Sequence, residues 1–228
     1  MRFADALRWM RITLLCAALV SCAAQNAKHE PSAGAAVSAA AGAGSPPATG
    51  AGARAETQPA VVSAEVLRAF DNAALALQQG HFEEAERGFL ELVRSNPELG
   101  GPHANLGIIY RHAGKLAQAA SELETAVHSN PQQPVFWNQL GITYREQGQF
   151  SKAREAYEKA IAIDPSYSAP YLNLGILFDL YLWDGKRALE LYDQYLAQSP
   201  GGDPTVTKWV ADLKIRNRET LAAPKEKQ

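Results

Sequence analysis

Histidine and cysteine are the residue types in this chain whose spacing would point most directly to metal or nucleophile chemistry. No two histidines stand four residues apart, the spacing of a helical zinc site. His103 and His112 are nine residues apart, which places them on nearly opposite sides of a helix. The only cysteines, Cys16 and Cys22, lie near the start, so the chain after them has no disulfide or cysteine-based metal site. The five histidines are His29, His81, His103, His112 and His128.

Other patterns that carry catalysis or nucleic-acid binding are also missing. There is no Gly-x-Ser-x-Gly elbow and no phosphate-binding loop. The segment from His81 to Ala85 lacks the second histidine of a zinc protease motif. The net charge is −2, with 22 basic and 24 acidic residues, so there is no excess of positive charge for a nucleic acid. We therefore expect no enzyme, no metal, no cofactor and no nucleic-acid partner.

The first 21 residues have the pattern of a secretory signal. Arg2, Arg8 and Arg11 are followed by nine apolar residues, Ile12 to Val20. That run is too short to span a bilayer, which takes roughly 20 apolar residues. The pattern predicts that residues 1–21 direct export and are then removed.

Cys22 is the residue with the most specific chemistry. The sequence Leu19-Val20-Ser21-Cys22 resembles the lipobox of bacterial lipoproteins. The resemblance implies that the Cys22 thiolate takes a diacyl lipid, with palmitate-type chains, and becomes the new N-terminus. Several acyl chains anchor a protein far more stably than one. By resemblance to the sorting rule of such proteins, Ala23 implies anchoring at the periplasmic face of the outer membrane.

An alternative remains for this segment. The general signal peptidase could cleave between Ser21 and Ala24 and release a soluble periplasmic protein. Residues 22–62 are in either case predicted to be a disordered tether. They are almost entirely Ala, Gly, Ser, Pro and Thr, with few large apolar side chains to offset the entropy of ordering.

A repeat of 34 residues begins after the tether. Prolines recur at this spacing, as do glycines, alanines and a Leu-Gly pair. The residues that recur are Pro97, Pro131 and Pro165; Gly80, Gly114 and Gly148; Ala85, Ala119 and Ala153; and Leu106-Gly107, Leu140-Gly141 and Leu174-Gly175. The small residues would let two helices of one repeat approach closely, and each proline would end the second helix.

This pattern closely resembles the tetratricopeptide repeat, most completely between residues 134 and 167. The resemblance implies an all-α fold: a right-handed solenoid of about four helix-turn-helix repeats within residues 63–202. The repeats are expected at 66–99, 100–133, 134–167 and 168–202. A capping helix at 203–219 would begin with Asp203 as N-cap and Pro204 as first residue, and residues 220–228 would be a disordered tail.

Two repeats depart from the pattern. In the first, Asn72, Ala73 and Ala76 replace the usual Leu-Gly and Tyr, so its helix pair is weakly specified and expected to fray. In the fourth, one extra residue precedes Ala188, and Tyr181-Leu182-Trp183 takes the place of the turn glycine. We expect a longer first helix or a bulged turn there. Tyr181 and Trp183 either pack against Trp209 of the cap or form an exposed interaction patch.

The family resemblance also predicts which residues bind a partner. In such arrays the first helix of each repeat lines a concave groove, to which positions 2, 5, 9 and 12 point. Isoleucines at position 9 and arginines at position 12 would flank amides at positions 5 and 6, and an acidic or C-terminal peptide segment would suit the arginines. The isoleucines could instead pack between helices, and the arginines could instead be solvated without binding a partner. The predicted groove residues are Asn105, Ile108, Arg111, Asn138, Gln139, Ile142, Arg145, Asn173 and Ile176.

These features predict a membrane-anchored protein-binding scaffold of the bacterial envelope. The groove would bind a peptide or protein segment of an envelope protein and so help to assemble a pilus, secretion, TonB-like transport or cell-wall complex. Two alternatives stay open: a self-associating structural lipoprotein that forms a homo-oligomer without a peptide ligand, and a regulator of a peptidoglycan enzyme.

Overall fold

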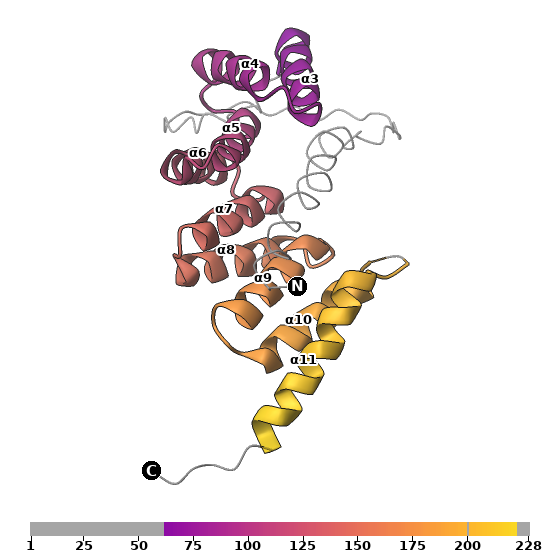
Figure 1. The fold of residues 1–228 in the computed structure, drawn as a ribbon. Helices are drawn as coiled ribbons and strands as arrows, with labels where there is room; N and C mark the ends of the chain where they lie inside the picture. The colour runs from indigo at the N-terminus through magenta and orange to yellow at the C-terminus, as the bar shows by residue number, and fades with distance from the viewer. Residues whose placement is uncertain (1–61, 200, 223–228) are drawn as a thin grey trace, which may run out of the picture. The chain divides into compact units, whose positions relative to one another are not determined.

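The computed structural model describes residues 62–199 and 201–222 (Figure 1). The expected signal peptide, Cys22 and nearly all of the expected tether lie outside these residues. In the described part the fold is entirely helical, which confirms the predicted all-α repeat architecture. Its helices are α3 (Ala64–Gln78), α4 (Phe82–Ser95), α5 (Gly100–His112), α6 (Leu116–Ser129), α7 (Pro134–Glu146), α8 (Phe150–Ile163), α9 (Ser168–Leu180), α10 (Gly185–Ala197) and α11 (Pro204–Ala222).

From Ala69 onward the helices pack in a regular order. Helix α5 packs against α6, α7 against α8 and α9 against α10, and each pair packs against the next. The first helices of successive pairs also touch, because α7 contacts both α5 and α9. These three helices therefore share one face, which we call the A face. None of the described helices is long and apolar enough to cross a membrane.

Glycine at position 8 of the second, third and fourth repeats sets the distance between the paired helices. A Cβ added at Gly141 would lie 2.5 Å from a ring carbon of Tyr157 on α8. One at Gly107 would lie 2.5 Å from Leu123, and one at Gly175 would lie 2.6 Å from Tyr192. The glycines are needed because the backbone of the first helix rests on a large side chain of the second.

The first repeat reaches the same packing with the small residue on the other helix. Position 8 is Ala73, and Gly88 on α4 faces it: a Cβ at Gly88 would lie 2.9 Å from that of Ala73. Phe70 and Phe89 also meet edge to face at 5.5 Å. Both helices are formed in the structure, and this exchange is why the missing Leu-Gly pair does not prevent their packing.

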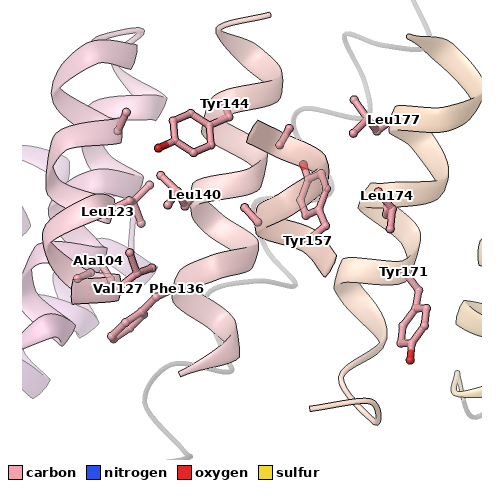
Figure 2. Packing of buried hydrophobic residues seen from close by; sticks show 14 of the residues in the cluster. Ala104, Leu123, Val127, Phe136, Leu140, Tyr144, Tyr157, Tyr171, Leu174 and Leu177 are labelled. Carbon is pink, nitrogen blue, oxygen red and sulfur yellow. The ribbon is translucent and has the colours of Figure 1, made fainter. Parts of the chain in front are cut away.

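The hydrophobic core runs through the repeats (Figure 2). Leu140 and Tyr144 point from α7 toward α6, where Leu123 lies opposite, and Tyr157 fills the other side of α7. The Tyr144 hydroxyl donates a hydrogen bond to Glu124 at 2.6 Å. Each first helix is thus packed on both sides, which leaves the A face as its remaining surface.

The turn between α9 and α10 contains the extra residue of the fourth repeat. Helix α9 has 13 residues, as do α5 and α7, so the insertion does not lengthen it and the turn bulges instead. Trp183 takes a φ of 57°, close to the 75° of Gly148 in the preceding repeat. The Asp184 side chain then caps α10 by accepting a hydrogen bond from the Arg187 amide at 3.0 Å.

Helix α11 covers the last pair of helices. Asp203 is its N-cap, as predicted, because its carboxylate accepts hydrogen bonds from the Thr205 and Val206 amides at 2.8 and 3.2 Å. Val206, Val210 and Leu213 are buried against α10 and its neighbours. The helix extends to Ala222, three residues beyond the expected end of the cap.

Candidate protein-binding face

The apolar members of the A face differ in exposure. Ile108 on α5 and Ile176 on α9 are buried, whereas Ile142 on α7 is half-buried. The alternative that these isoleucines serve packing therefore describes Ile108 and Ile176 better than a binding ladder does. Ile142 is the apolar member that remains accessible.

Three of the four predicted amides donate hydrogen bonds within the protein, and the fourth, Gln139, is buried, so the prediction that it lines the groove is wrong. Asn173 on α9 donates to Asn138 on α7 at 3.0 Å, and Asn138 donates to the Tyr167 hydroxyl at 3.2 Å. Asn105 donates to the carbonyl of Gly101 in its own helix at 3.0 Å. Asn138 and Asn173 thus link α7 to α9, whereas Asn105 bonds within α5, and the spacing of these residues alone did not reveal either role.

The predicted arginines are brought close together at the C-terminal ends of α5 and α7. Arg111 and Arg145 are both half-buried, and Arg111 Nη1 donates a long hydrogen bond of 3.4 Å to the carbonyl of Gln139 on α7. Burial lowers the pKa of Arg111, against a smaller raising effect of Glu146. Arg145 Nη1 is buried and has no hydrogen-bond partner.

Asp179 holds the equivalent position on α9 but is turned into the protein. Its carboxylate pairs with Arg216 on α11 at 3.0 Å and accepts a hydrogen bond from the Tyr192 hydroxyl at 3.4 Å. The prediction that this position points into the groove is therefore wrong for the fourth repeat. The cause is α11, whose Arg216 is 37 residues away in sequence and carries no signal that links it to Asp179.

The histidines form structural contacts where the structure describes them. His103 Nδ1 lies 2.6 Å from a carboxylate oxygen of Glu122 and its Nε2 lies 3.2 Å from the Pro97 carbonyl. His112 stacks on Phe82 with ring centroids 4.0 Å apart. Among the described residues, no group of three or more His, Cys, Asp or Glu side chains could hold a metal ion.

The predicted aromatic patch splits into two parts. Tyr181 contacts Phe150 of α8, with ring centroids 4.9 Å apart. Trp183 is 80% exposed, so the alternative that it packs against the cap is wrong. Trp209 of the cap lies instead beside Tyr192, with ring centroids 6.1 Å apart. The left-handed backbone of Trp183 directs its side chain away from the protein.

A shallow hollow of about 320 Å³ lies beside α7 and α8. Its apolar wall includes Trp137, Leu140 and Tyr144, and its rim carries Lys152 and Lys159. Lys152 lies over the Tyr144 ring at 5.2 Å, so one of these lysines already has a partner.

Comparison with known proteins agrees with this geometry. The sequence matches the tetratricopeptide repeat family over residues 70–134 and again over residues 134–167. Residues 70–167 therefore have the sequence pattern of tetratricopeptide repeats. Such repeats are the fold of protein-interaction scaffolds. The comparison with curated proteins found no match to the sequence.

Solved structures show the same fold. PilF of Pseudomonas aeruginosa is 22% identical with a TM-score of 0.62, and the match covers 68% of this chain and 70% of that one. A tetratricopeptide protein of Thermus thermophilus is 24% identical with a TM-score of 0.57, over 66% of this chain and 81% of that one. An O-GlcNAc transferase of Thermobaculum terrenum is 20% identical with a TM-score of 0.56, over 59% of this chain but only 26% of the enzyme. The absence of catalysis in the present chain stays a prediction.

Proposed function

We propose that the chain is a membrane-anchored scaffold of the bacterial envelope that binds a segment of another envelope protein on its A face. The observation that supports this most is the alignment of α5, α7 and α9, which presents Arg111, Ile142 and Arg145 as half-buried side chains on one rigid surface. Regular helices hold such side chains in fixed positions, so little entropy is lost when a peptide binds.

The anchoring part of the proposal rests on Leu19-Val20-Ser21-Cys22 and on Ala23. A lipid on Cys22, followed by about 40 small and polar residues, would hold the repeats near the periplasmic face of the outer membrane while letting them reach a partner. The machine would be one that assembles at the envelope, such as a pilus, secretion, TonB-like transport or cell-wall complex.

Lipidation is tested by labelling growing cells with an alkyne analogue of palmitate. We expect the wild-type chain to take up the label and Cys22→Ser to lose it, together with its association with membranes. Cys16→Ser is the matched control, because it lies inside the signal and should leave labelling intact. Label in neither chain would show that the general peptidase releases a soluble protein.

Partner binding is tested by photocrosslinking in cells with a reactive residue at Ile142. Glu158 on α8 is the control position, since its side chain is 53% exposed and lies on a second helix of a repeat. We expect a protein to be captured from position 142 and not from position 158. Capture of the same protein from both positions, or from neither, would contradict binding on the A face.

Self-association is a second candidate function, which the 80% exposure of Trp183 favours. If Trp183 mediates it, the mass of the purified protein should rise with concentration. The change Trp183→Gly should abolish that rise and also stabilise the monomer by about 1 kcal/mol, because glycine adopts a positive φ without steric cost. Sedimentation and thermal unfolding measure the two effects, and a constant mass at all concentrations would exclude this function for Trp183.

A further inference from the structure

Arg111 and Arg145 are cations without an anionic partner in the part of the chain that the structure describes. The ion pairs found there within 4.0 Å join other side chains, and neither arginine has a carboxylate at that distance. Buried charges in proteins are normally paired, since removal from water without a partner costs free energy. The half-buried Arg111 and Arg145 are exceptions to this pairing, which is consistent with a ligand that supplies the anion.

The two guanidinium groups act on the same place. Both affect the pKa of the Tyr157 hydroxyl. Burial raises this pKa to about 12, and the positive charges of Arg145 and Arg111 oppose the rise. The Tyr157 hydroxyl and Arg145 Nη1 are both buried without a hydrogen-bond partner. Two unused donors of the third repeat therefore lie close to Arg111 of the second repeat.

The acidic groups nearby do not neutralise this pair. Glu146 is exposed and lies beyond ion-pair distance of both arginines. Asp179, the nearest equivalent on α9, is already held by Arg216 and by the Tyr192 hydroxyl. The charge of the arginines is thus left for a group from outside the chain.

We propose that Arg111 and Arg145 together bind one carboxylate of the partner polypeptide that lies across α5 and α7. This inference rests on the proposed function and adds the chemistry of the ligand to it. The arginine fork suits a carboxylate, because it donates two parallel hydrogen bonds to the two oxygens. Ile142 lies one turn before Arg145 on α7, so an apolar side chain beside the carboxylate would complete the recognised motif.

The test selects peptides from a random library on the immobilised full-length protein. The most enriched peptide is synthesised as selected, with its acidic side chains changed to amides, and with its C-terminal carboxylate blocked. We expect the wild-type protein to bind the acidic form at least about tenfold more tightly than the form that lacks the critical carboxylate. The variant Arg111→Gln/Arg145→Gln should bind all forms equally, and Arg154→Gln on the outer side of α8 should behave as the wild type.

The outcomes separate this inference from the proposed function. The form that loses affinity identifies the carboxylate as a side chain or as the C-terminus. Loss of binding in Ile142→Glu shows that a peptide binds through Ile142. If the affinity of such a peptide depends neither on its own carboxylates nor on the two arginines, the inference is overturned and the proposed function stands. If no selected peptide depends on Ile142, both fail.

Stability provides a measurement that needs no ligand. If Arg145 is kept for binding, then Arg145→Met should raise the melting temperature of the free protein by about 2 to 4 °C, because it removes an unpaired, partly desolvated charge and keeps the apolar stem. A lower melting temperature would show that the Arg145 charge supports the fold, which would overturn the premise of the site.

Discussion

Replacing Gly141 by alanine is expected to destabilise the protein by about 2 to 3 kcal/mol, which is the opposite of the usual effect. In a helix interior this change normally gains about 1 kcal/mol. Here the new Cβ would lie 2.5 and 2.6 Å from two ring carbons of Tyr157, which is fully buried and has no room to move. The overpacking cost therefore exceeds the gain in helix propensity. Urea unfolding of the wild type and the variant measures the difference.

The first repeat tolerates alanine at position 8, because Ala73 faces Gly88 on the other helix. In the third repeat a Cβ at position 8 would instead meet the ring of Tyr157. We therefore expect Gly141→Ala to cost less in a Tyr157→Ala background, so the free-energy changes of the two substitutions should not add. Additive losses, or a stable Gly141→Ala variant, would contradict the account of glycine as the residue that sets the helix spacing.

Raising the pH above about 10 is expected to destabilise the fold steeply through three buried tyrosines, Tyr144, Tyr157 and Tyr192. Burial raises the pKa of Tyr157 to about 12. Burial, together with the hydrogen bond and charge of Glu124, raises the pKa of Tyr144 further. Burial, together with the charge and hydrogen bond of Asp179, likewise raises the pKa of Tyr192 further. An unfolded tyrosine loses its proton at about pH 10. The unfolded chain therefore binds fewer protons than the folded chain above that pH, and stability falls as pH rises.

The loss should amount to roughly 4 kcal/mol per pH unit between about pH 10 and 12, with roughly 1.4 kcal/mol from each of the three tyrosines, and stability should not depend on these groups below pH 10. Chemical unfolding at a series of pH values measures the slope, and tyrosinate absorbance shows whether ionisation accompanies unfolding. Tyr157→Phe is the control: the Tyr157 hydroxyl has no hydrogen-bond partner, so the variant should fold normally and lose about a third of the slope. An unchanged slope would exclude Tyr157 as a source of the effect.

The helices and their pairing could be predicted from the sequence because they depend on local pattern. Prolines and Leu-Gly pairs at a spacing of 34 residues specify where helices end and where they approach. The prediction of Asp203 as an N-cap was correct for the same reason, since capping involves only residues two and three positions away. Lipidation of Cys22 stays a prediction, because that residue lies outside the described part of the chain.

The candidate site was predicted only in outline. Family positions placed Arg111, Ile142 and Arg145 on helices that the structure brings side by side. They gave no sign that Asn138 and Asn173 bond to each other, and they left open whether the isoleucines are buried, as Ile108 and Ile176 are. Those properties depend on how neighbouring repeats meet, and a periodic pattern describes each repeat in the same way regardless of its neighbours.

The sequence by itself determined that this protein is a helical repeat, because the spacing of small and large residues allows one way for the helices to pair. Only the tertiary structure decided which charged side chains form ion pairs within the protein. Asp179 and Arg216 are 37 residues apart and meet because α11 folds back on α9 and α10. Arg111 and Arg145 lie beside each other with no such partner. Electrostatic pairing depends on distance in space, and for these residues only the packing of successive repeats sets that distance.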